Sequence, residues 1–196
     1  IERHFYKKVF NTAIVCVASN FDSFEVLKKY RHDGIRFDRI FVDTKLFNEK
    51  VKPINKPKKK FTFLSPGRIG KAKGMDIIWE ALKLCKTDFD VLQVEWFMER
   101  TEEEKKDNEI LIKNLPTQVK LIPLIRREEL PNYFVWADAI MGQMYTGSTG
   151  AVERDAAFCK KPVIHYTDPN KTALIDSKEI IPSFEPKSNK SHIIAE

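Results

Sequence analysis

The feature that most constrains this chain is a regular alternation of short apolar stretches and longer amphipathic ones from residue 61 onward. Short apolar stretches bounded by turn residues predict buried strands, and apolar residues at helical spacing predict helices. The predicted strands are Phe61–Leu64, Asp90–Trp96, Gln118–Ile125, Asp138–Met144 and Pro162–Tyr166. The predicted helices are Met75–Lys86, Glu99–Asn114, 126–137 and Gly150–Lys160. This order predicts an α/β fold in which a parallel sheet has helices on both faces.

The first sixty residues follow a looser pattern. The run Thr12–Ala18 predicts a buried strand, Phe21–Arg31 a helix and Ile35–Asp43 another strand. The next stretch, Asn48–Lys60, contains two prolines and six lysines without periodicity. Such a stretch is typical of a linker, so we expect a domain boundary there.

Composition narrows the class of protein. The 196 residues are 42% hydrophobic, enough for a folded core, and the formal charge of +6 favours an anionic partner such as a phosphate-bearing ligand, a membrane surface or a nucleic acid. The three cysteines are far apart and odd in number, which favours a reducing compartment over a disulfide framework. No stretch approaches the roughly 20 apolar residues that span a bilayer. The chain starts without a methionine or a signal peptide, so we expect a fragment of a longer protein.

The loop "SPGRIGKAKGMD", from Ser65 to Asp76, follows a predicted strand and opens a helix. It carries Arg68, Lys71 and Lys73 among three glycines, and a helix N-terminus with nearby cations attracts anions. It lacks the Gly-Lys-Ser/Thr ending of a Walker loop and the glycine spacing of the dinucleotide fingerprint. From the residues alone, the loop is either a phosphate site or a solvated basic loop.

A second loop of this kind precedes the last predicted helix. Gly147 and Gly150 bracket Ser148 and Thr149, and glycine lets a backbone approach a ligand closely. We expect the amides of Thr149, Gly150 and Ala151 to point outward; alternatively, this is an ordinary loop in which Ser148 or Thr149 caps the helix. Because ligands of open α/β sheets sit at the carboxyl ends of the strands, the two loops together predict a diphosphate site.

Three segments occur in an order that resembles a known family. They read "FLSPGRIGKAKGMD", "VKLIPLIRREELPNYFVWADAIM" and "GSTGAVERDAAFCKKPVI". The order resembles the donor half of the retaining glycosyltransferases of family 4, which have the two-domain GT-B architecture and a Rossmann-like parallel sheet in that half. The first residues, up to Tyr30, resemble the end of the acceptor half, and "FVDTKLFNEK" resembles the hinge. The resemblance therefore implies three parts: residues 1–50 as the end of the acceptor half with the hinge, 51–60 as a basic linker, and 61–196 as a donor-binding domain that is incomplete at its carboxyl end.

The resemblance also implies roles for individual residues. Arg68 and Lys73 would be the catalytic cations that neutralise the donor diphosphate, and Ser148, Thr149, Gly150 and Ala151 would hold the same phosphates. Asp155 would bind the ribose, while Pro123 and Ile125 would lie near the base. The position that touches the transferred sugar in this family falls on Gly147, which has no side chain. The resemblance implies neither a metal nor another cofactor, because the cations and the helix dipole would neutralise the diphosphate as a metal ion does in other enzymes.

The expected activity is a retaining transfer of a hexose from a nucleotide-diphosphate sugar to a glycan or lipid-linked acceptor, with this fragment inactive alone. The expected location is cytoplasmic, at the membrane face, with peripheral membrane contact. We do not expect nucleic-acid binding, because the lysines of the linker lack interleaved aromatic residues. Two alternatives stay open: a catalytically impaired homologue that binds a nucleotide or a partner, and another GT-B enzyme such as a sugar-nucleotide epimerase.

Overall fold

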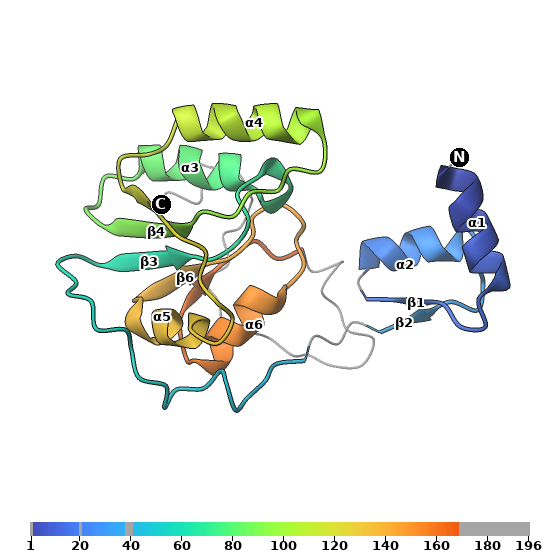
Figure 1. Ribbon diagram of the computed structural model, residues 1–196, viewed down its shortest axis with the longest axis horizontal. Coiled ribbons are helices and arrows are strands. Elements are labelled where there is room, and N and C mark those ends of the chain that lie inside the picture. The colour runs from blue at the N-terminus through green and yellow to red at the C-terminus, as the bar shows by residue number, and fades with distance from the viewer. Residues whose placement is uncertain (1, 20, 38–40, 169–196) are drawn as a thin grey trace.

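The computed structural model describes residues 2–19, 21–37 and 41–168 of the chain (Figure 1). Its main part is a five-stranded parallel sheet in the order β5-β4-β3-β6-β7. The strands are β3 (Thr62–Ser65), β4 (Asp90–Val94), β5 (Val119–Ile122), β6 (Ala139–Met141) and β7 (Val163–Ile164). The helices between them are α3 (Met75–Leu84), α4 (Glu102–Lys113), α5 (Leu130–Trp136) and α6 (Ala151–Phe158), and a short 3-10 helix, η1 (Lys71–Lys73), precedes α3. The predicted alternation and the parallel sheet are confirmed.

Two apolar layers cover the sheet, one on each face. Along β4, Val91 packs with α3 and α4, whereas its neighbour Leu92 packs with α5 and α6. The same alternation occurs in β6, where Met141 and Ile140 point to opposite layers. Figure 1 shows α3 and α4 on one side of the strands and α5 and α6 on the other. Burial on both faces explains why the sequences of these strands are largely apolar.

The strand order places a topological switch point between β3 and β6. The chain moves outward from β3 through β4 to β5, then returns to the other side of β3 to form β6 and β7. The loops that follow β3 and β6 therefore leave the same edge of the sheet in opposite directions. Open α/β sheets bind ligands in the crevice between two such loops.

Several elements are shorter than their sequence patterns predict. Helix α5 begins at Leu130 rather than at residue 126, with Pro131 in its first turn. Proline is tolerated in this turn because its missing N–H would have no partner inside the helix. Strand β5 ends at Ile122, directly before Pro123, which cannot donate a ladder hydrogen bond.

The first residues form two helices and a small parallel sheet. These elements are α1 (Glu2–Thr12), β1 (Val17–Ala18), α2 (Phe21–Lys28) and β2 (Ile35–Arg36). The prediction of a buried strand over Thr12–Ala18 is wrong for most of its length, because α1 extends to Thr12 and Ile14 is 94% exposed. Its apolar residues have just one neighbouring strand among the described residues, so they are not covered as a central strand would be. The second predicted strand, Ile35–Asp43, includes residues 38–40, which lie outside the described residues.

The basic segment 51–60 lies against α5. The backbone N–H of Ile54 donates to Asn132, and the indole N–H of Trp136 donates to the Lys56 carbonyl at 2.8 Å. The Lys58 ammonium forms an ion pair of 2.6 Å with Asp138. The segment is therefore attached to the sheet domain. The proposed division into domains stays a prediction.

Candidate functional site

The loop after β3 is fixed to the end of β4. The side-chain amide of Gln93, which is fully buried, donates to the Gly67 carbonyl at 2.9 Å. Ile69 then exchanges hydrogen bonds with the chain beyond β4: its N–H donates to Trp96 at 2.7 Å and its carbonyl accepts from Met98 at 2.9 Å. These bonds lengthen the β3–β4 pairing past the strand ends, so the loop has one defined backbone path.

The three cations of this loop differ in their partners. Lys71 forms an ion pair of 2.7 Å with Asp107, and this hydrogen bond raises the pKa of Lys71. The guanidinium of Arg68 lies 4.4 Å from the ring centre of Trp96, where a cation is attracted to the aromatic face. Among the described residues, no carboxylate lies within ion-pair distance of Arg68 or Lys73. Their two charges are therefore not neutralised by this part of the chain.

Gly74 joins this loop to the loop after β6. It precedes α3 in the left-handed conformation, with φ of 71°, and a Cβ atom there would lie 2.9 Å from the backbone of Met144. The N–H of Met144 donates to the Lys73 carbonyl at 3.0 Å. The two loops singled out from the sequence are thus in direct contact, on the two sides of the switch point.

Gln143 shapes the loop after β6 from within. Its side-chain oxygen accepts from the backbone N–H groups of Tyr145 (3.0 Å) and Thr146 (2.7 Å). Its side-chain nitrogen donates to the carbonyls of Ser148 (2.7 Å) and Tyr166 (3.3 Å). One buried side chain therefore fixes four backbone groups of the loops that follow β6 and β7.

Glu153 closes the same loop from the first turn of α6. It is 2% exposed, and its two oxygens accept from the N–H groups of Gln143 and Gly150, each at 2.9 Å. The expectation that the Gly150 amide points outward is therefore wrong, because that amide is held by Glu153. Gly150 is the N-cap of α6, so the alternative in which Ser148 or Thr149 caps the helix is also wrong. Within the described chain, the amides of Thr149 and Ala151 have no hydrogen-bond partner.

Asp155, the predicted ribose contact, is covered. Its side chain is 1% exposed and forms an ion pair of 2.7 Å with Arg127, whose own side chain is half exposed. Burial raises the pKa of the Asp155 carboxyl, and Arg127 opposes this shift. Its second oxygen, Oδ1, has no hydrogen-bond partner in the described part of the chain. The ribose role stays a prediction.

The remaining predicted residues occupy other positions. Pro123 is exposed at the end of β5, and Ile125 packs against the cluster that contains Phe47. Arg127, two residues further on, lies over the Phe47 ring at 4.5 Å, and its ion pair with Asp155 connects this loop to α6. Gly147 is buried in the loop after β6. Gln143, Glu153 and Trp96 were missed by sequence reasoning; the signal for Gln143 was a polar residue directly after an apolar strand.

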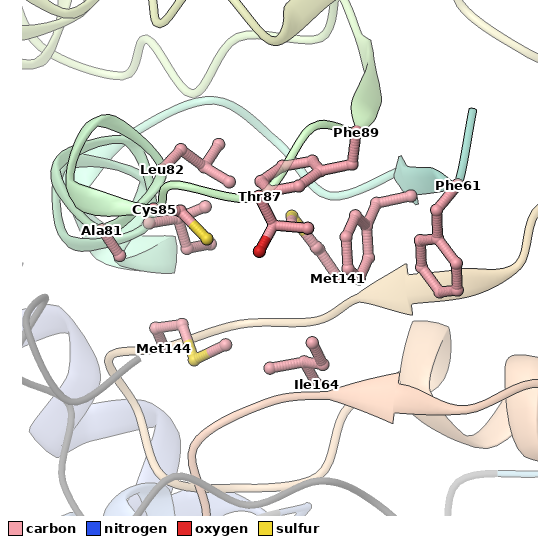
Figure 2. A pocket seen from close by; sticks show the side chains of 11 residues that line it. Phe61, Ala81, Leu82, Cys85, Thr87, Phe89, Met141, Met144 and Ile164 are labelled. Atoms are coloured by element: carbon pink, nitrogen blue, oxygen red, sulfur yellow. The ribbon is translucent and has the colours of Figure 1, made fainter. Parts of the chain in front are cut away.

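A cavity of about 300 Å³ lies elsewhere, between α3 and the strands β6 and β7 (Figure 2). Its lining is apolar apart from Thr87 and includes Phe61, Leu82, Met141 and Ile164. None of the residues predicted to bind the donor lines it. A phosphate-bearing ligand would find no charged group there, so this cavity is not the donor site.

The described residues contain neither a group of metal ligands nor a membrane-spanning helix. In these ranges, no three His, Cys, Asp or Glu side chains are grouped as metal ligands would be. No helix in the same ranges is long and apolar enough to cross a membrane.

Comparison with known proteins identifies the family. The sequence profile described as "Glycosyl transferases group 1" matches residues 47–194, which is most of the chain. The chain belongs to the glycosyl transferases group 1 family. This confirms the resemblance described above. Among curated proteins, none is similar enough in sequence to count as a match.

Solved structures place this group 1 chain in the GT-B fold. The glycosyltransferase from Rickettsia africae is 20% identical to this chain, with a TM-score of 0.68, and the match covers 98% of this chain and 55% of the glycosyltransferase. HepE from Anabaena, solved with UDP and glucose, is 16% identical with a TM-score of 0.69, covering 100% and 57%. The C-terminal domain of the group 1 protein LpcC from Francisella tularensis is 21% identical with a TM-score of 0.51, covering 80% and 93%. The predicted donor-half fold is confirmed, and the chain spans little more than half of the first two structures.

Proposed function

We propose that this chain binds the diphosphate of a nucleotide sugar between the loops after β3 and β6, as part of an enzyme that transfers the sugar with retention. The observation that carries the proposal is the pair Arg68 and Lys73. Both cations lie in a loop at the switch point of the sheet, and neither is neutralised by a described carboxylate, whereas Lys71 in the same loop is. Membership of the group 1 family supports the same assignment.

The chemistry follows from the charge that develops when the bond to the sugar breaks. The leaving group is a nucleoside diphosphate, which gains negative charge as the sugar departs. Fixed cations that face this charge lower the barrier because they need not reorganise during the reaction. We assign this role to Arg68 and Lys73, with the amides of Thr149 and Ala151 contributing hydrogen bonds. Trp96 holds the Arg68 guanidinium over its ring, and Gly74 keeps the Lys73 carbonyl bonded to Met144.

The donor is proposed to be a hexose ester of a nucleoside diphosphate. HepE from Anabaena was solved with UDP-glucose, and a sucrose-phosphate synthase from Thermosynechococcus elongatus has a TM-score of 0.67 to this chain at 18% identity. The base is proposed to lie near Pro123 and Ile125, and the ribose near Asp155. The acceptor is proposed to be a glycan or a lipid-linked glycan at the cytoplasmic membrane face, which agrees with the formal charge of +6. The chain by itself is proposed to bind the donor without transferring the sugar.

Calorimetric titration of the full chain with UDP, GDP and ADP tests the donor site. We expect one of them to bind, and the double change Arg68→Ala with Lys73→Ala to lower its affinity at least about 100-fold, because each charge-assisted hydrogen bond contributes about 1.5–3 kcal/mol. Lys71→Ala is the matched control: it removes a lysine from the same loop whose charge is already paired, so we expect less than a twofold change. Absence of binding at millimolar nucleotide would contradict the proposal, as would equal losses in the variant and the control.

A second candidate is a homologue that binds the nucleotide without transfer. Gly147 favours it, because the position that touches the sugar in this family has no side chain here. Incubating the longer protein that contains this chain with nucleotide sugars and glycan acceptors distinguishes the two. Release of the nucleoside diphosphate with formation of a glycosylated product supports transfer, whereas nucleotide binding without turnover supports the second candidate.

A further inference from the structure

Helix α4 buries one polar residue beside the loop after β3. The helix is rich in charged side chains, and its two buried residues are Asn108 and Leu111. Leu111 belongs to the apolar layer between the helices and the sheet, as expected for an amphipathic helix. Asn108 is 2% exposed, and a Cβ atom added at Gly70 in the loop would lie 3.6 Å from its Oδ1. A buried polar side chain of α4 therefore lies against the loop that carries the cations.

Hydrogen bonds connect Asn108 to this loop through Met98. The Asn108 Nδ2 donates to the Met98 carbonyl at 3.0 Å, and the Met98 N–H donates to the Ile69 carbonyl at 2.9 Å. The Asn108 Oδ1 is buried and has no hydrogen-bond partner in the described part of the chain. An unpaired buried acceptor lowers stability, and proteins keep such exceptions mainly at functional sites. This cost indicates a functional reason for an asparagine at this position.

Gly70 connects Asn108 to Lys73. A Cβ atom at Gly70 would lie 3.2 Å from the Cβ of Met98, which is closer than carbon atoms normally approach. The Gly70 carbonyl accepts from the N–H of Lys73 at 3.0 Å and so closes the turn η1. The Lys73 carbonyl in turn accepts from the N–H of Met144 at 3.0 Å. The backbone of Lys73 is therefore held between Gly70, which lies against α4, and the loop after β6.

We propose that Asn108 is a positioning residue of the phosphate site: by fixing Gly70 against α4, it holds Lys73 in place for the donor diphosphate. This inference rests on the proposed function of the loop as a diphosphate site. A cation that is already in position stabilises a charge without the cost of ordering it. The ion pair between Asp107 and Lys71 also joins α4 to this turn, but Lys71 is exposed, and such pairs contribute little.

A thermodynamic cycle between Asn108→Ala and Lys73→Ala tests this role in the full chain. Calorimetry measures the affinity of the wild type, the two single variants and the double variant for the diphosphate that binds best among UDP, GDP and ADP. We expect Asn108→Ala alone to lower the affinity about fivefold, the net contribution of one hydrogen bond. In the Lys73→Ala background the same change should lower it less than twofold, because the cation that Asn108 positions is already absent.

Leu111→Ala is the matched control, because Leu111 is the other buried residue of α4 and packs in the apolar layer. We expect it to lower the melting temperature at least as much as Asn108→Ala does, while the nucleotide affinity changes less than twofold. Gly70→Ala probes the same contact from the loop, since its Cβ atom would press against Met98. Its effect on affinity should depend on Lys73 in the same way, which keeps the test decisive where Asn108→Ala fails to fold.

The outcomes separate this inference from the function on which it rests. Equal losses of affinity from Asn108→Ala in the two backgrounds would overturn it, because Asn108 would then not act through Lys73. Unchanged affinity in Asn108→Ala would overturn it as well, and so would a similar loss in Leu111→Ala. In these three cases nucleotide still binds the wild type, and the proposed function stands. If no nucleotide binds the wild type, the proposed function fails, and this inference fails with it.

Discussion

The loops after β3 and β6 flank the same point of the sheet, but they are built in opposite ways. The loop after β3 leaves the charges of Arg68 and Lys73 without a described carboxylate partner, while backbone bonds fix its path. The loop after β6 has no cation, and two buried side chains, Gln143 and Glu153, accept from four of its backbone N–H groups. The difference indicates that the two loops have separate roles. The loop after β3 supplies positive charge to the proposed ligand, and the loop after β6 supplies a fixed backbone surface.

Removing the internal support of the second loop should have the largest effect. Glu153→Ala leaves the buried N–H of Gln143 and the partly buried N–H of Gly150 without an acceptor, and a buried unpaired group costs about 1–3 kcal/mol. We expect urea denaturation to show a loss of about 3 kcal/mol. Glu80→Ala, an exposed helical glutamate, is the matched control and should change stability by less than about 0.5 kcal/mol. Equal stability of the two variants would mean that the hydrogen bonds of Glu153 do not stabilise this loop.

The contact between the loops gives the next largest effect. Gly74→Ala puts a Cβ atom at 2.9 Å from the Met144 backbone and keeps a left-handed conformation that costs a residue with a side chain about 1–2 kcal/mol. We expect a loss of about 2 kcal/mol in chemical denaturation. A Cβ atom at Gly67, in the same loop, would meet nothing within 4 Å, so Gly67→Ala should be close to neutral. A similar loss in both variants would argue against a specific contact at Gly74.

The loop after β5 reaches the same part of the molecule through the ion pair between Arg127 and Asp155. A change of Asp155 tests whether this third loop also contributes to ligand binding. Burial raises the pKa of this carboxyl above its unfolded value of 3.8, so its contribution to stability is present below that pH and is lost as the pH rises through the folded value. Asp155→Asn stays neutral, and its stability relative to the wild type should therefore increase between pH 4 and pH 7. If Asp155 binds ribose, the same variant should bind the nucleotide about tenfold more weakly. Denaturation at the two pH values and calorimetry measure the two effects separately, and a relative stability that decreases with pH would contradict the burial argument.

The smallest expected effect concerns the ring beneath Arg68. Trp96→Ala removes a cation–π contact that contributes about 0.5–1 kcal/mol at exposed sites. We expect a two- to fivefold loss of nucleotide affinity with little change in melting temperature, because Trp96 is partly exposed. Trp96→Phe keeps an aromatic face and should recover much of the affinity. No difference among the three proteins would mean that Trp96 does not position the guanidinium.

The sequence by itself determined the fold class, the five strands of the sheet and the two loops. Apolar runs such as Ala139–Met141 identify buried strands because a strand covered on both faces has no side that faces water. The glycines and cations of the loops are local properties, which a pattern can reveal. The same holds for the resemblance to the family, which depends on motifs within continuous segments.

Only the tertiary structure decided which charged and hydrogen-bonding groups of the candidate site have a partner within the described chain and which have none. Asp155 is paired with Arg127 from another loop, and the Gln143 side chain donates to the Tyr166 carbonyl beyond the next strand. Lys71 is neutralised across 36 residues while Lys73 is not, although the two lysines look alike in the sequence. Asp168 lies beside Gly147 because two parallel strands end at the same edge of the sheet. These outcomes depend on contacts between segments that are distant in the chain, and local patterns carry no record of such contacts.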